Sequence, residues 1–394
     1  MPQKSFEVPV EPAVMKWARE SAGRTIGDVA VRLGVSEDLV KSWESGKRKP
    51  TITRLRILTD YYQRPLDAFL LSAPPEESPT PKDFHFRSLP NKEASPLQAD
   101  TLFALRKAKR LQSVAAELKG EFHNKLVDSI GKVTEASNPE LLAVKVRGLI
   151  KIDHEAQSKW KKDSGALNQW IKAVGAFNIL AIQVSMPLED ARAFCLINGG
   201  YPVIVLNTKE PPNARIFSLF HEVGHVLLDI EGICDPSGYP VFNERSRDIE
   251  IFCNHFAGAF LVPKNDLMEH SLVRENNTSA WSNRTLQTIS RTFKVSKEVI
   301  LRRLLLFDLT TESFYNEWKN RDEQSRQEML KKQEERGGGG GRDIARECIQ
   351  QNSAPIVSLI LESYYNRRIS KYDISDYLEI NLKYLSNIER TLEV

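Results

Sequence analysis

Residues 216–228 read IFSLFHEVGHVLL, which places two histidines four residues apart within an apolar run. The apolar residues on both sides predict a mostly buried helix. Residues four apart lie on the same face of a helix, so His221 and His225 can point at one metal ion. Glu222 can reach a water molecule on that metal and take its proton as a general base, without binding the metal itself. The stretch therefore predicts a Zn²⁺ site of the metallopeptidase type, with Glu222 as its catalytic residue.

The third metal ligand has to come from another part of the chain, because a catalytic zinc ion takes three protein ligands and leaves one position for water. A second apolar helix is predicted over residues 248–262, closed by Pro263. Its start lies far enough beyond His225 for a loop to return to the site. Glu250 and His255 are the candidate ligands on this helix, and Glu244 is an outside possibility. The spacing alone also allows Glu250 to be an ordinary surface residue.

A short β-structure is predicted just before the histidine-containing helix. Two β-rich runs, 193–197 and 202–206, flank Asn198-Gly199-Gly200 and indicate a hairpin with a short turn. Residues 97–181, 284–307 and 314–336 have helical patterns instead, and the last of these is densely charged. Five glycines, Gly337–Gly341, then break the chain as a natural joint or an engineered linker, and 342–394 is again helical. The fold class expected is therefore mostly α with a small β-sheet.

The first part of the chain carries an all-α helix-turn-helix pattern within residues 12–71. Thr25 can cap a helix over 26–33, Gly34 makes a turn, and Ser36 caps a second helix over 37–45. If this unit binds DNA, the residues expected to contact phosphates or base edges are Lys41, Ser42, Lys47, Arg48 and Lys49. The acidic pair Glu37 and Asp38 opens the second helix, where its charge would face phosphate. A protein-binding or degenerate domain therefore stays open as the alternative.

Two later stretches, 285–305 and 369–391, also suggest helix-turn-helix units. Plain helical packing around the metal-site domain explains the same patterns, and it is the favoured interpretation. The C-terminal stretch 342–394 is in addition a candidate plug that covers the metal site.

Composition limits the class of protein. A chain of 394 residues suggests two or three domains. The net charge of +3 is too small to indicate nucleic-acid binding by itself. There is no secretory pattern in residues 1–14 and no run of roughly 18–20 apolar residues, so a cytoplasmic protein without a membrane span is expected. The cysteines show no paired spacing, which predicts reduced, buried thiols at Cys195, Cys234, Cys253 and Cys348.

Domain boundaries follow from proline and glycine. Four prolines between residues 72 and 81 predict an extended linker. We therefore expect a helix-turn-helix domain over 1–71, a linker over 72–96, a metallopeptidase domain over 97–320, and a C-terminal part over 321–394 made of a charged helix, the glycine joint and a helical extension.

Both motifs resemble known families. The histidine helix, together with Glu250-x-x-Cys253-Asn254-x-Phe256-Ala257 and Leu261-Val262-Pro263, is similar to the ImmA/IrrE metallopeptidases over about residues 80–320. That resemblance implies Glu250 as the third zinc ligand and an α+β, gluzincin-like core in which a small sheet packs against two site helices. Cys253 departs from the family's usual alanine, and Asp229 stands where a histidine often follows. The residues 43–50, WESGKRKP, resemble the W-E-x-G-x-x-x-P signature of XRE/Cro-type domains.

The resemblance implies a regulatory endopeptidase with a narrow protein substrate, commonly an XRE-type repressor, in a stress, phage or toxin-antitoxin circuit. The alternative is an antitoxin or transcription regulator that binds operator DNA and a toxin partner with little or no proteolysis. Helix-turn-helix domains often bind two half-sites as dimers, so a homodimer is one expected arrangement. A general digestive protease does not fit a chain without a secretion signal or a disulfide framework.

Overall fold

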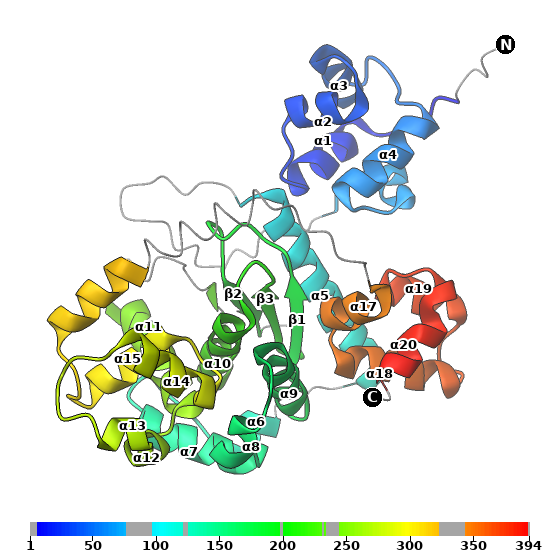
Figure 1. Ribbon diagram of the computed structural model, residues 1–394. Coiled ribbons are helices and arrows are strands. Elements are labelled where there is room, and N and C mark those ends of the chain that lie inside the picture. The colour runs from blue at the N-terminus through cyan, green and yellow to red at the C-terminus, as the bar shows by residue number, and fades with distance from the viewer. Residues whose placement is uncertain are drawn as a thin grey trace. The chain divides into compact units, whose positions relative to one another are not determined.

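The computed structural model describes residues 6–75, 97–120, 125–197, 200–230, 232–233, 244–322 and 343–392 (Figure 1). The chain divides into two compact units, Met1–Lys107 and Ala108–Val394. Most of the described chain is helical, with one small sheet, which confirms the predicted fold class. Linker residues 76–96 and the run Gly337–Gly341 lie outside the described part. Within that part, no helix is both long and apolar enough to cross a membrane.

The first unit is a bundle built around a helix-turn-helix. Its elements are α1 (Pro12–Ser21), α2 (Ile26–Leu33), α3 (Glu37–Glu44), α4 (Ile52–Tyr62) and the 3₁₀ helix η1 (Leu66–Leu70). Thr25 caps α2 in a reciprocal capping box with Asp28, and Ser36 caps α3. Gly34 ends α2 with φ at +63°, a conformation that costs glycine little. The predicted caps and turn are thus confirmed.

The second unit begins within α5 (Ala99–Lys119) and contains the sheet. Further helices of this unit are α6 (Lys125–Ile130), α7 (Pro139–Ile150), α8 (His154–Ser158), α9 (Asp163–Gly175), α12 (Lys264–Glu269), α13 (Ser271–Arg274), α14 (Asn283–Phe293) and α15 (Lys297–Leu306). Residues 312–322 are helical as well, and the remainder of the predicted charged helix lies outside the described residues. The stretch 284–307 packs its apolar side chains into the main core of this unit, as helical packing predicts.

The sheet has the strand order β1-β3-β2-β4, formed by β1 (Leu180–Val184), β2 (Ala193–Leu196), β3 (Val203–Asn207) and β4 (Gly232–Ile233). Strands β2 and β3 pair antiparallel with Phe194 opposite Val205, so the predicted hairpin is confirmed. Its turn residues Asn198 and Gly199 lie outside the described part. Strand β1 pairs parallel with β3 and corrects the prediction of helix up to residue 181.

Helices α10 (Pro212–Leu228) and α11 (Glu244–Leu261) are the two predicted site helices. Helix α10 lies on β2, β3 and α9, and α11 packs against α10 on one side and α7 on the other (Figure 1). The main core gathers apolar side chains from all of these elements. A small sheet therefore supports two packed helices, which is the arrangement that the family resemblance implies.

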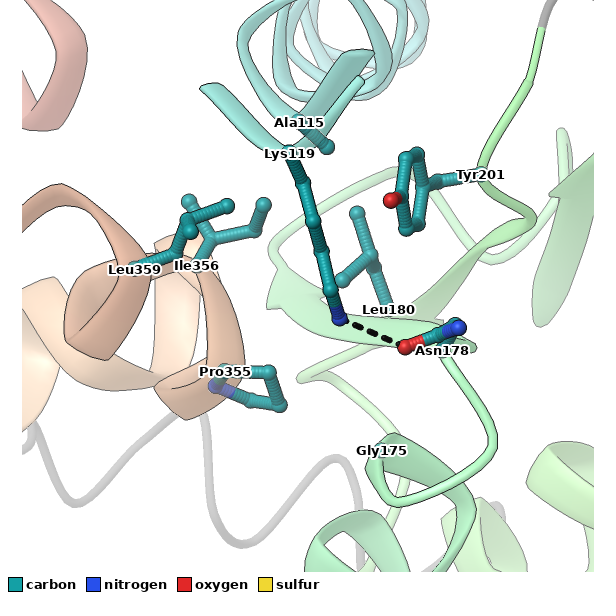
Figure 2. A pocket seen from close by; sticks show the side chains of 9 residues that line it. All are labelled: Ala115, Lys119, Gly175, Asn178, Leu180, Tyr201, Pro355, Ile356 and Leu359. Atoms are coloured by element: carbon teal, nitrogen blue, oxygen red, sulfur yellow. Dashed lines mark hydrogen bonds between the residues drawn. The ribbon is translucent and has the colours of Figure 1, made fainter. Parts of the chain in front are cut away.

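The C-terminal segment is made of α17 (Ile344–Asn352), α18 (Ala354–Tyr365), α19 (Lys371–Leu378), η2 (Leu382–Tyr384) and α20 (Leu385–Leu392). It packs on β1 and α9, and Arg110 of α5 holds Asp376 at 2.8 Å. Figure 2 shows the junction, where Lys119 donates to Asn178 at 2.7 Å beside Ile356, at a small pocket. These contacts give no support to the idea that the segment plugs the metal site.

Candidate metal centre

Three side chains from the two site helices converge on one point. His221 and His225 lie one turn apart on α10, and their Nε2 atoms are 3.2 Å apart. Glu250 of α11 places one carboxylate oxygen 3.3 Å from Nε2 of His221 and the other 3.1 Å from Nε2 of His225. Tetrahedral zinc ligands at about 2.0–2.1 Å from the ion stand about 3.3 Å from one another. The spacing of the three groups fits one zinc ion.

Gly224 lets the two helices approach closely enough for this convergence. A Cβ atom at Gly224 would lie 3.1 Å from Sγ and 3.2 Å from Cα of Cys253, which is tighter than nine in ten real Cβ contacts. The absence of a side chain at Gly224 therefore places Glu250, one turn before Cys253 on α11, beside the two histidines.

Asn254 fixes the orientation of one imidazole. Its Oδ1 lies 3.1 Å from Nδ1 of His221. An amide oxygen only accepts hydrogen bonds, so Nδ1 of His221 donates to it, and Nε2 is the ring nitrogen that faces Glu250. Metal-ligating histidines are commonly held in this way through their other nitrogen. The sequence motif contained Asn254, but its role depends on a contact across two helices.

Glu222 is fully buried, and neither of its carboxylate oxygens has a hydrogen-bond partner among the described residues. Nδ1 of His225 is likewise without a partner there. Buried polar groups in proteins are nearly always hydrogen-bonded, because leaving one unpaired costs free energy. The unpaired carboxylate next to the histidines is therefore suited to a small polar ligand such as water.

The charges of the site are strongly coupled. Burial by itself lowers the pKa of His221, but the charge and hydrogen bond of Glu250 outweigh burial and raise it. For Glu250, burial raises the pKa, and the two histidines lower it well below the usual range. These opposite shifts show how strongly the Glu250 carboxylate interacts with His221. Carboxylate and imidazole are both groups that bind zinc in proteins.

His255, the other candidate ligand on α11, points to a different place. Its Nε2 lies 2.8 Å from Oε1 of Glu140 on α7, and Arg303 of α15 binds the same carboxylate. Burial opposes ionisation of Glu140, yet the hydrogen bonds from His255 and Arg303 lower its pKa to about 2. His255 therefore belongs to a cluster that ties three helices together. The side chain of Glu244 lies outside the described part of the structure.

Cys253 is closer to the histidines than its expected role as a small buried hydrophobe requires. Its Sγ and ring nitrogens of His221 and His225 all lie within 4.8 Å of one another, and all three residues are buried. Cys195 and Cys348 are also buried thiols, as predicted, whereas Cys234 lies outside the described residues. The packing of α11 on α10 brings the Cys253 thiol, a group that can bind zinc, close to the two histidines.

The five predicted DNA contacts fall into two groups. Lys41 lies on α3 at 3.5 Å from Glu37 and 3.8 Å from Asp38, and the Ser42 hydroxyl donates to the Leu39 carbonyl at 2.6 Å. The other three follow α3 and are exposed: Lys47, Arg48 and Lys49. None of these three forms an ion pair with a described residue. Lys41 and Ser42 are thus engaged within their own helix, whereas Lys47, Arg48 and Lys49 are available to a partner.

Comparison with known proteins matches both parts of the chain. Residues 174–305, from the end of α9 to α15, match the model of the IrrE N-terminal-like domain, an M78 peptidase family. Residues 15–69 match the helix-turn-helix family model. No curated protein matches the chain. The matched regions contain the two site helices and the capped helix pair, so the chain joins a helix-turn-helix domain to an ImmA/IrrE-type domain of the M78 peptidase family.

Proposed function

We propose that the M78 domain is a zinc-dependent endopeptidase. His221, His225 and Glu250 hold the Zn²⁺ ion, and Glu222 is the general base. One observation carries this proposal: the two Nε2 atoms and the Glu250 carboxylate oxygens lie 3.1–3.3 Å from one another. Beside them is the fully buried Glu222, whose carboxylate has no hydrogen-bond partner among the described residues.

The residues have separate tasks in this chemistry. When bound, zinc supplies a Lewis acid that brings the pKa of water toward neutrality and polarises the peptide carbonyl. Glu222 removes a proton from the attacking water and passes it to the departing amine. Asn254 keeps the lone pair of His221 directed at the metal. Burial of Glu222 keeps competing solvent away from the proton that it carries.

The partner that we propose is a DNA-associated regulator. A helix-turn-helix domain in the same chain supports a protein substrate that acts on the same DNA, such as a repressor or toxin in a stress, phage or toxin-antitoxin circuit. Lys47, Arg48 and Lys49 would supply phosphate contacts to operator DNA, because they are exposed cations with no described ion partner. A homodimer would present two such domains to two half-sites.

A second candidate function is regulation of transcription with little or no proteolysis. The observation in its favour is Cys253, because a zinc ion with four protein ligands forms a closed site without a position for water. In that case the M78 domain would bind a partner rather than cut it.

Metal content tests the site before any substrate is known. We expect elemental analysis of the purified chain to find close to one zinc per chain, and expect Glu250→Gln and His221→Ala to lose it. Glu222→Gln is the matched control, since it should keep the metal. Cleavage of a proteome-derived peptide library by the wild type, absent with Glu222→Gln, would support the peptidase. Full zinc loading without any cleavage would favour the second function, and a wild type that takes up no zinc would overturn both.

A further inference from the structure

The C-terminal segment repeats the backbone of the N-terminal helix-turn-helix. Helices α2 and α19 have the same length of eight residues, and each begins with a reciprocal capping box, Thr25 with Asp28 and Ser370 with Asp373. Each ends in the left-handed conformation, at Gly34 and at Glu379. The family models matched only the first of these two units.

The turn and the start of the second helix also occur at the same spacing in the two units. The N–H of Val35 donates to the Ala30 carbonyl at 3.0 Å, and that of Ile380 donates to the Ser375 carbonyl at 3.2 Å. Two residues after the left-handed position stands an N-cap in each unit, Ser36 before α3 and Asn381 before η2 and α20.

The buried positions also correspond. Val29 and Trp43 in the first unit have buried counterparts in Ile374 and Ile388. Helix α20 packs on α17, and α19 packs on α18, so the second pair has its own helical support. The N-terminal and C-terminal units therefore share the caps, the turn and the buried positions of one helix-turn-helix motif.

The same backbone also occurs at α14 and α15, so the backbone alone does not single out the C-terminal unit. They share the left-handed turn at Lys294, the Val295-to-Ser290 hydrogen bond and the serine cap of Ser296. Half of α15 is buried in the core, however, and Arg303 is held by Glu140. Whether one of these units can bind in a DNA groove therefore depends on the exposed side chains of its second helix.

On η2 and α20, the exposed side chains have the chemistry of base recognition. They are Leu382, Lys383, Ser386, Asn387 and Arg390. Arginine pairs with guanine and asparagine with adenine in the major groove. The corresponding part of α3 opens with the acidic Glu37 and Asp38 instead. Of the two helices, α20 therefore fits double-stranded DNA better than α3.

Cations also flank the second unit where a helix-turn-helix crosses the phosphate backbone. Arg367, Arg368 and Lys371 are exposed at the start of α19 and form no ion pair with a described residue. Two acidic residues of α19, Asp376 and Glu379, pair with Arg110 instead. The three cations are therefore available to an anionic group such as a phosphate.

We propose that residues 344–392 contain a second DNA-binding helix-turn-helix. Helix α20 enters the major groove of double-stranded DNA, where Asn387 and Arg390 contact adenine and guanine edges. Arg367, Arg368 and Lys371 contact the phosphates. The chain then carries two DNA-reading units, one before and one after the M78 domain.

Selection of bound duplexes from a randomised pool by the full chain tests this. We expect two sequence motifs from the wild type. Asn387→Ala/Arg390→Ala should lose one motif and weaken binding to it at least about fivefold. Lys47→Ala/Arg48→Ala/Lys49→Ala should keep that motif. Arg367→Ala/Arg368→Ala should lower the slope of log affinity against log salt by about 1.8.

Lys172→Ala is the matched control, because it removes an exposed cation from α9 in the same unit. It should change neither motif nor slope, and thermal melting should verify that all variants fold. The proposal is overturned if Asn387→Ala/Arg390→Ala selects the wild-type sequences with wild-type affinity. It is equally overturned if the wild type binds single-stranded RNA as tightly as any selected duplex.

Discussion

The side-chain oxygen of Asn254 lies 3.1 Å from Nδ1 of His221, and it thereby sets which nitrogen of that imidazole faces Glu250. The contact joins α11 to α10 at the point where the candidate ligands meet. It makes Asn254 a positioning residue for the metal site.

Asn254→Ala should weaken zinc binding about 10- to 100-fold, because partners of this kind orient the ligand and raise its basicity. Competition with a chelator of known affinity measures the change. Asn276→Ala is the control, since Asn276 makes its hydrogen bonds to Thr278 and Ala280 at an exposed turn. Equal zinc affinity for Asn254→Ala and the wild type would contradict the positioning role.

Gly224→Ala should lower the free energy of unfolding by about 1–3 kcal/mol, the range for overpacking a tight contact. The added methyl group meets Cys253, including its backbone Cα at 3.2 Å, so Cys253 on the facing helix has to shift. Denaturant titration measures the loss, and zinc content should fall with it.

Gly148→Ala is the matched control for this prediction. Gly148 is also helical, but nothing lies within 4 Å of an added Cβ, so alanine should stabilise the helix by about 0.5–1 kcal/mol. If both alanine variants were stabilising, Gly224 would not be the residue that sets the distance between α10 and α11.

Arg303→Met should cost about 2–3 kcal/mol of unfolding free energy. Arg303 is 3% exposed, binds the Glu140 carboxylate with two nitrogens and donates to the Val262 carbonyl at 3.0 Å. Breaking a fully buried pair costs about 3–5 kcal/mol, and Glu140 is partly exposed, so we expect less. On the same helix, Arg302→Met removes a partly exposed pair with Glu298 and a contact with the Tyr315 ring, and should cost less, about 0.5–1 kcal/mol. Similar losses for the two variants would refute this account.

The sequence was most informative where the determining contacts are local. Thr25, Gly34 and Ser36 act on backbone groups within a few residues, so caps and turn could be predicted directly. The pair His221 and His225 depends only on the period of one helix. Neither pattern depends on contacts with distant parts of the chain.

The sequence was least informative where the structure depends on contacts between segments that are far apart in the chain. Strand β1 has only five residues, LAIQV, too few to separate strand from helix by period, and its partner β3 lies beyond another strand. Glu250 and His255 could not be separated on α11, because the difference depends on Glu140 of α7. The proximity of Cys253 to the histidines depends in the same way on how closely α10 and α11 pack.

Acidification should destabilise the fold through His154 and His270. Burial lowers the pKa of both imidazoles, so the unfolded chain binds more protons than the folded one. Their contribution to stability is complete above the unfolded pKa of about 6.5 and is lost as pH falls through the lower folded values. His154→Phe should flatten the dependence of unfolding free energy on pH between 7 and 5, because a phenyl ring can still stack on Phe293, where the ring centroids are 4.3 Å apart. Denaturant titrations in excess chelator keep metal binding constant across this range. An unchanged slope in His154→Phe would mean that protonation of this half-buried imidazole does not couple to folding.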